Sequence, residues 1–212
     1  AKKLSFYIKN DIPWSRPEWK ELGSKINRVS LSPNGERVLA VARGDLFSIP
    51  AKEGVTYNLT NSSNANDKIG EWAPNGDGYA YVTDKDGEFN IWYVNGAGEE
   101  RRLTNVIGHI LGMEWSPDSK WIAWNEKSNT LNVLEVATGR NIEVERSDFR
   151  VMSDYNWSPD GKYLAYTRPQ SGSNLVVLYN VESGEKVVVT DEWYDSLQPS
   201  FSSDGNYLLF GS

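Results

Sequence analysis

The fold is decided by the stretch WSPDGKYLAY, which occupies residues 157–166. Its turn tetrapeptide returns along the chain as SPNG at 32–35, APNG at 73–76, SPDS at 116–119 and SSDG at 202–205. Successive copies lie 41 to 44 residues apart, which is the period of a propeller blade. The repeat therefore predicts an all-β propeller in which each blade contains one copy of the turn.

Strand-length apolar runs on both sides of each turn predict the first two strands of a blade. A large apolar residue stands immediately before every copy, namely Leu31, Trp72, Trp115, Trp157 and Phe201. The fixed phase of these residues favours packing between blades over the stacking of sugars or bases. Third strands are expected at 46–49, 91–94, 131–134 and 175–179, and fourth strands at 57–60, 101–104, 142–145 and 187–190. No segment has a convincing helical period, so helices should be few.

These strands predict one propeller domain over residues 1–212. Residues 1–25 are expected to supply the outer strand of a preceding blade, at 2–8, and a linker. Complete blades of four antiparallel strands follow at 26–60, 61–104, 105–148 and 149–192, with half a blade at 193–212. Because a closed ring hides its sheet edges, open edges at 2–8 and 207–210 indicate part of a six- to seven-bladed propeller. They also predict edge-strand pairing between chains or a homo-oligomer.

Composition excludes several functional classes. The 212 residues carry a net charge of −7 and are 12% aromatic, which is unlike a disordered chain. No cluster of Lys and Arg interrupts the acidic balance, so nucleic-acid binding is not expected. No apolar run is long enough to insert into a membrane. The absence of Cys excludes disulfides and thiolate chemistry, but leaves both the cytoplasm and a bacterial or archaeal periplasm open.

Three short motifs are better explained by turns than by chemistry. His109 is the only histidine, lies in a connection between blades and has no Gly-x-Ser-x-Gly elbow to serve, so no catalytic residue is predicted. The stretch DKDGE at 84–88 resembles the start of a calcium loop, but a strand resumes directly after it, so neither a metal nor a cofactor is predicted. The tripeptide RGD at 43–45 is expected to form a tight turn between strands.

The first strand of each blade is the remaining candidate site, because in a propeller this strand lines the central axis. Period-two alternation places one set of polar side chains on a common face. These candidate channel-lining residues are Arg28, Ser30, Glu71, Glu114, Asp154, Asn156, Gln198 and Ser200. They predict a hydrated, mildly anionic passage; the alternative is that they only solvate a lumen without function.

The blade resembles the WD40-like repeats found in TolB and in the tricorn peptidases. The tricorn type is indicated by SLSP at 30–33, ARGDLF at 42–47, EG at 53–54 and NLT at 58–60, and by the linker RP at 16–17. The next unit is similar to that family's following blade in Asp84, GE at 87–88 and LT at 103–104. This resemblance covers nearly the whole chain.

The resemblance implies the second, larger propeller of a tricorn-like serine peptidase. Such a propeller would be non-catalytic and would admit or gate oligopeptides through its channel, while the catalytic Ser and His lie in another part of the protein. An alternative is a TolB-like scaffold that binds another protein in the bacterial envelope. A prolyl oligopeptidase-like propeller fits less well, because nothing in the chain leads into a hydrolase domain. The expected partner is a peptide or a protein.

Overall fold

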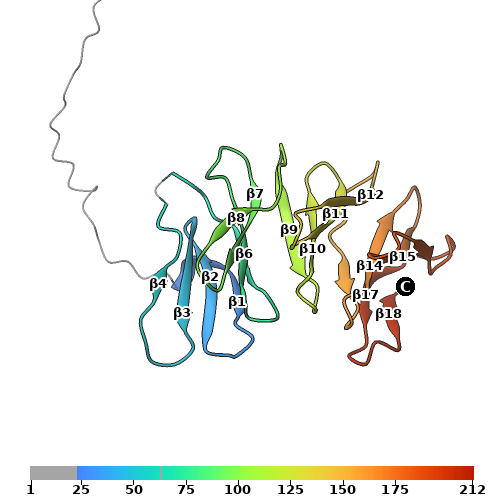
Figure 1. The fold of residues 1–212 in the computed structure, drawn as a ribbon. Coiled ribbons are helices and arrows are strands. Elements are labelled where there is room, and N and C mark those ends of the chain that lie inside the picture. Colours follow the sequence, from blue (N-terminus) through green and yellow to red (C-terminus); the bar gives the residue numbers. More distant parts are fainter. Residues whose placement is uncertain (1–22, 63) are drawn as a thin grey trace, which may run out of the picture.

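A computed structural model describes residues 23–62 and 64–212. Within them, all strands fall into five antiparallel sheets that follow one another along the chain (Figure 1). The first two sheets are β1 (Ile26–Leu31), β2 (Arg37–Ala42), β3 (Asp45–Pro50) and β4 (Tyr57–Asn58), then β5 (Ile69–Trp72), β6 (Gly78–Thr83), β7 (Asn90–Asn95) and β8 (Glu100–Arg102). The third is β9 (Ile110–Trp115), β10 (Trp121–Glu126), β11 (Thr130–Glu135) and β12 (Asn141–Arg146). The fourth and fifth are β13 (Tyr155–Trp157), β14 (Tyr163–Pro169), β15 (Asn174–Asn180) and β16 (Lys186–Val188), then β17 (Leu197–Phe201) and β18 (Leu208–Gly211).

Each complete sheet has its four strands in chain order, so the first strand forms one edge and the fourth strand the other. This is the order that the repeat predicts, and the fifth sheet contains the predicted first two strands. A single 3-10 turn, Gly23–Lys25, precedes β1 in the described part of the chain. The strand predicted at 2–8 lies outside the described residues.

The repeated tetrapeptide builds the same hydrogen-bonded turn each time. In the fourth sheet the Ser158 hydroxyl donates to Asp160 Oδ1 at 2.6 Å and accepts the Tyr163 N–H at 2.9 Å. Gly161 donates its N–H to the Ser158 carbonyl and has a φ of 72°, a left-handed conformation that glycine adopts without strain. Ser202 and Asp204 repeat the side-chain bond at 2.6 Å. In the fourth and fifth sheets Ser, Asp and Gly therefore close the hairpin between the first two strands together. The copies at 73–76 and 116–119 have Ala73 in place of Ser and Ser119 in place of Gly, and they keep the backbone bond of the turn, from the Gly76 N–H to the Ala73 carbonyl and from the Ser119 N–H to the Ser116 carbonyl.

The large apolar residues before the turns pack between sheets, as their phase predicts. Trp115 lies with Ile91 and Ile122 in the cluster between the second and third sheets, and Trp157 lies with Tyr166 in the cluster between the third and fourth. Trp157 is only 4% exposed. Leu31, at the same place in the first sheet, is 62% exposed, because no described strand covers that face. Burial between neighbouring sheets is therefore what holds the stack together.

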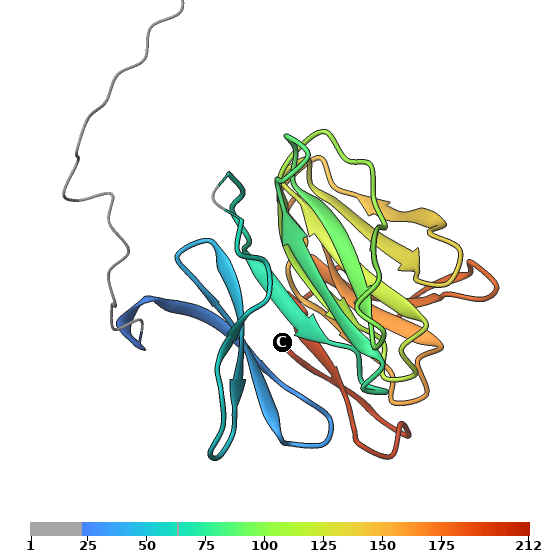
Figure 2. The ribbon, with the colours of Figure 1, turned by 60° about the vertical axis from the view of Figure 1, so that its left-hand side comes forward.

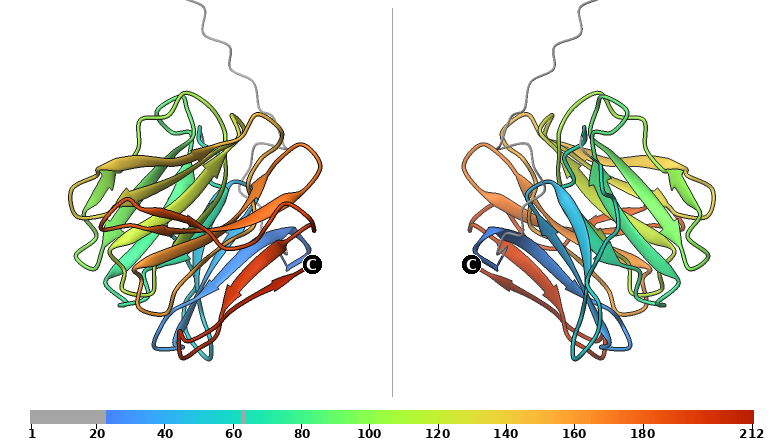
Figure 3. Two further views of the ribbon diagram at one scale, coloured as in Figure 1. Left: turned by 90° about the vertical axis from the view of Figure 1, so that its right-hand side faces the viewer. Right: turned by 90° about the vertical axis from the view of Figure 1, so that its left-hand side faces the viewer.

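The arrangement is a fan of twisted sheets. The sheets stand one after another in chain order in Figure 1, and in the turned view the sheets after the first overlap one another (Figure 2). The side views show hairpins and loops at both ends of the strands (Figure 3). First strands of neighbouring sheets contact one another, as in the pairs β1 and β5, β5 and β9, and β13 and β17. The inner edges of the sheets therefore lie together, which is the geometry of a propeller sector.

The remaining motifs adopt the turns that the sequence predicts. Arg43 and Gly44 join β2 to β3 with φ values of 56° and 84°, and Ala42 pairs with Asp45 across them. Two consecutive positive φ values define the tight hairpin turn that suits twisted strands. At 84–88 the Gly87 N–H donates to the Asp84 carbonyl at 2.7 Å, which closes the β6–β7 turn. Across residues 23–62 and 64–212, no helix is both long and apolar enough to cross a membrane.

Candidate channel site

One cavity opens where the inner edges of four successive sheets meet. We call it the inner-strand cavity; it has a volume of about 430 Å³. Its polar lining comes from Arg28 on β1, Glu71 on β5, Glu114 on β9, Asn125 on β10, Ser153, and Tyr155 on β13. Leu111, Gly112, Met113 and Val151 complete it. The cavity is therefore shared by first strands that are distant in sequence.

The cavity is lined by one cationic side chain and two carboxyl groups. Arg28 Nη1 lies 3.7 Å from Glu71 Oε1, and Glu114 adds a second carboxylate. Burial raises the pKa of Glu71 to about 7, although the charge of Arg28 opposes the shift. Burial also raises the pKa of Glu114 to about 7, and the neighbouring charge of Glu71 adds to the effect. With pKa values of about 7, both carboxyl groups are partly protonated near neutral pH.

Two neutral polar groups line the same cavity. Asn125 is buried and donates from Nδ2 to the Met152 carbonyl at 3.0 Å. The Tyr155 hydroxyl donates to Asn125 Oδ1 at a long 3.5 Å. Burial, with the charges of Glu114 and Glu71, raises the pKa of Tyr155, so its hydroxyl keeps its proton. Tyr155 and Asn125 thus offer hydrogen bonds without adding charge.

The eight candidate residues do not all reach this cavity. Arg28, Glu71 and Glu114 line it. Ser30 and Asn156 instead bridge to the next sheet, where their side-chain oxygens accept the N–H of Trp72 at 3.1 Å and of Phe201 at 3.0 Å. These two short polar side chains therefore hold neighbouring first strands together.

The other three candidates lie elsewhere on the inner strands. Asp154 lines a smaller cavity of about 190 Å³ with Arg150 and Thr167. Gln198 and Ser200 are exposed on β17. Gln198 has a φ of 53° at an irregularity in the pairing of β17 with β18, so simple alternation of faces does not hold there.

Sequence reasoning missed Asn125 and Tyr155 as part of the site. Asn125 could have been found from the sequence, because the same position of the second strand is occupied by valine, Val41 and Val82, in the two preceding repeats. A buried amide in an apolar column requires partners, and such positions often serve a site. Tyr155 had no such signal, since aromatic residues are common throughout the repeat.

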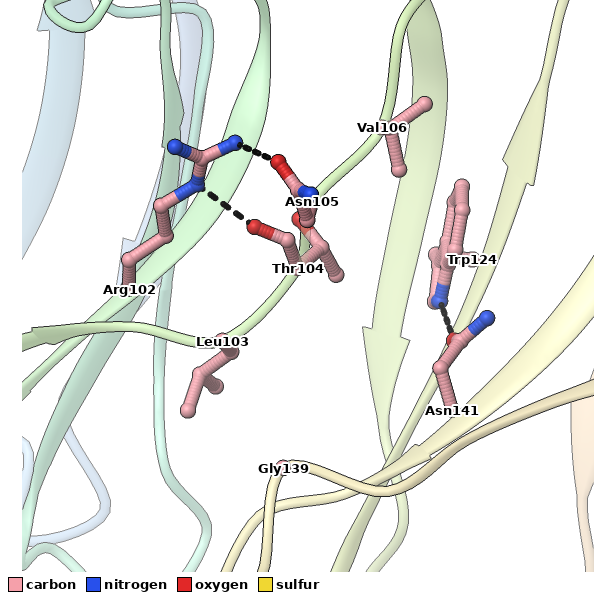
Figure 4. Close-up of a pocket in the computed structure, with 8 residues that line it drawn as sticks. All are labelled: Arg102, Leu103, Thr104, Asn105, Val106, Trp124, Gly139 and Asn141. Atoms are coloured by element: carbon pink, nitrogen blue, oxygen red, sulfur yellow. Dashed lines mark hydrogen bonds between the residues drawn. The ribbon is translucent and has the colours of Figure 1, made fainter.

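A second cavity, of about 680 Å³, lies between the second and third sheets (Figure 4). Its Arg102 donates from Nε to the Thr104 carbonyl at 2.7 Å and from Nη2 to Asn105 Oδ1 at 2.6 Å. Across the cavity Trp124 Nε1 donates to Asn141 Oδ1 at 2.9 Å. The polar groups drawn there already bond to one another, so this opening offers a ligand fewer free partners than the inner-strand cavity.

His109 lies just before β9 in a basic and aromatic setting. The Lys68 ammonium donates to His109 Nε2 at 2.8 Å, and the Phe89 ring contacts His109 edge-on at 4.8 Å between centroids. Burial and the charges of Lys68 and Lys127 lower the pKa of His109. The residues that the structure describes include no group of three or more His, Cys, Asp or Glu able to hold a metal ion.

Sheets of four antiparallel strands, stacked with their first strands around a shared polar cavity, define a β-propeller. The family model named "Tricorn protease second beta propeller domain" matches residues 26–212. The chain therefore belongs to the family of the second β-propeller domain of tricorn proteases. The resemblance carried by residues 30–60 is confirmed.

Comparison with individual proteins agrees with this family. The chain is 25% identical over 188 residues to the tricorn protease of Thermoplasma volcanium, covering 85% of this chain and 18% of that protein. A crystal structure of the tricorn protease superposes with a TM-score of 0.80 and 15% identity, covering 92% of this chain and 20% of the other. The structure of a putative TolB from Agrobacterium tumefaciens superposes with a TM-score of 0.63 and 20% identity, covering 87% of this chain and 69% of the other. The chain spans about a fifth of the length of the curated relatives it matches.

Proposed function

We propose that the chain is the non-catalytic propeller portion of a tricorn-like serine peptidase and that it admits or gates oligopeptides. The inner-strand cavity is the observation that carries this proposal. It is formed by the first strands of four sheets, which are the strands that surround the axis of a propeller. In this proposal the peptide passes along the polar face of these strands to chemistry performed by another part of the protein.

The size and lining of the cavity suit an extended peptide. Its volume of about 430 Å³ falls within the range of roughly 300–1,000 Å³ typical of ligand sites. A peptide that leaves water must find partners for its backbone N–H and C=O groups. Arg28 and Tyr155 supply donors and Asn125 and the carboxylates supply acceptors, so the wall can exchange bonds with a passing backbone.

The absence of cysteine permits a direct test, because one introduced thiol can be labelled alone. Ser153 is exposed and lines the cavity, so Ser153→Cys followed by a bulky maleimide should obstruct it. Binding is measured by fluorescence anisotropy with a pool of unstructured ten-residue peptides labelled at their C termini. We expect obstruction at 153 to weaken binding at least tenfold.

Ser171→Cys is the matched control, since Ser171 is exposed in the loop between β14 and β15 and does not line the cavity. Its labelling should leave binding unchanged. Peptide binding that survives obstruction at 153 would contradict the proposal. Binding of a folded protein, indifferent to that label, would favour a scaffold of the TolB kind.

A further inference from the structure

The inner-strand cavity contains one cation for two carboxylates. Arg28 lies on the Glu71 side, 3.7 Å from Glu71 Oε1. The Glu114 carboxylate has no hydrogen bond or ion pair with any residue in 23–62 or 64–212. The other groups that face the pair are Tyr155 from β13 and Asn125 from β10, and both are neutral. The described wall therefore leaves a carboxylate without a partner at the cavity.

The wall beside Glu114 is also kept open by a glycine. A Cβ atom at Gly112 would stand 2.8 Å from Asn125 Oδ1 and 3.0 Å from Tyr155 Oη. Those separations are shorter than ordinary contacts, so a side chain at 112 would fill the space in front of both polar groups. The hydrogen in place of a side chain leaves a recess with a carboxylate, an amide and a hydroxyl at its edge.

We infer that the inner-strand cavity binds the ammonium group of a peptide, either the α-ammonium or a lysine side chain, at the carboxylates of Glu71 and Glu114. This inference rests on the proposed function and names the class of peptide that the cavity selects. An ammonium has three donors and no acceptor, so two carboxylates and the Asn125 amide oxygen match it. It also supplies the positive charge that Arg28 alone does not.

The energetics favour such a ligand. Two close carboxylates repel each other, and a cation between them turns that repulsion into attraction. Hydrogen bonds between charged partners are about twice as strong as those between neutral groups. Because the empty carboxyl groups have a pKa of about 7, a bound ammonium should also displace protons from them. An anionic peptide would instead be repelled.

The test compares three synthetic peptides on the whole chain by isothermal titration calorimetry at pH 7. The probes are pentaalanine amide with a free N terminus, its N-acetylated form, and N-acetyl-Ala-Ala-Lys-Ala-Ala-amide. We expect at least one cationic peptide to bind about tenfold or more tightly than the neutral one. The free-amine and lysine arms distinguish the two sources of the ammonium. Repeating the titration in phosphate and in Tris should reveal release of a fraction of a proton.

Glu114→Gln removes the charge and keeps the shape, so it should reduce the preference for the cationic peptide to less than threefold. Glu182→Gln, at an exposed position away from the cavity, should keep the full preference. Equal binding of all three peptides to the unaltered chain would overturn the ammonium site while leaving peptide admission intact. If no peptide bound at all, the proposed function itself would fail.

Discussion

Replacing Trp157 with Ala should remove a main contact between the third and fourth sheets. The side chain is 4% exposed within the cluster that includes Leu131, Val144 and Tyr166. Truncation of a buried Trp to Ala costs about 3–5 kcal/mol through lost burial and the cavity left behind. Its Nε1–H also donates to the Glu114 carbonyl at 3.3 Å, and losing that bond adds about 1 kcal/mol.

A loss of about 4–6 kcal/mol is comparable with the total stability of a domain, which is about 5–15 kcal/mol. Urea unfolding followed by far-ultraviolet circular dichroism measures it as a lower midpoint. Trp193→Ala is the matched control, because Trp193 is 85% exposed in the loop before β17. We expect that control to change stability by less than about 0.5 kcal/mol. A loss of less than about 1 kcal/mol in W157A, or an equal loss in W193A, would show that Trp157 does not hold the two sheets together.

Three further changes have defined outcomes. Asp67 is 2% exposed and neither of its carboxylate oxygens has a hydrogen-bond partner within the described residues, and burial raises its pKa despite the nearby Thr60 and Thr83 hydroxyls. The stability that Asp67 provides is fully present below its unfolded pKa and is lost as pH rises through the folded pKa. Asp67→Asn should therefore raise the free energy of unfolding at pH 7 by about 1 kcal/mol, seen as a higher urea midpoint, and should leave it unchanged at pH 3; a lower midpoint at pH 7 would contradict this. The lowered pKa of His109 gives the opposite pH dependence. The stability that neutral His109 provides is present above pH 6.5 and is lost as pH falls toward the folded pKa. His109→Gln should therefore make the free energy of unfolding fall less steeply with acid than it does in the unaltered chain. If stability fell with acid equally in both proteins, protonation of His109 beside Lys68 would not contribute to the pH dependence. Finally, exposed Leu209 on β18 should promote pairing between chains, and Leu209→Lys should lower the weight-average mass in sedimentation equilibrium; unchanged mass would argue against edge pairing.

The fold was predictable because one repeated turn marks the position of the first two strands in every sheet. At 158–161 the Ser158 hydroxyl, the Asp160 carboxylate and the left-handed Gly161 form a turn through hydrogen bonds between near neighbours in the chain, and such local bonds can be predicted from sequence. Its spacing then sets the four strands of each sheet, and the order of strands in the structure follows. The ends of the fourth strands were less predictable: of the strand expected at 57–60, only Tyr57–Asn58 is a strand in the structure, although the Leu59 N–H still donates to the Leu46 carbonyl.

The site was only partly predictable, because alternation along a strand assumes regular pairing. The register of β1 shifts between Ile26 and Arg28, and that of β17 shifts between Leu197 and Ser200. A bulge turns the following side chain, and its position depends on the partner strand rather than on the residue itself. Nor does sequence show that Ser30 and Asn156 bond to the neighbouring sheet, whereas Glu71 and Glu114 at the same repeat position reach the cavity.

Photocrosslinking can locate the path of a peptide along the inner strands. A ten-residue peptide carrying a benzophenone side chain is irradiated with the chain, and mass spectrometry locates the attachment. We expect crosslinks around Gly112 on β9 and around Ser153 and Tyr155, at the start of β13, that excess unlabelled peptide suppresses. Suppressible crosslinks confined to the outer strands β8, β12 and β16 would contradict this path.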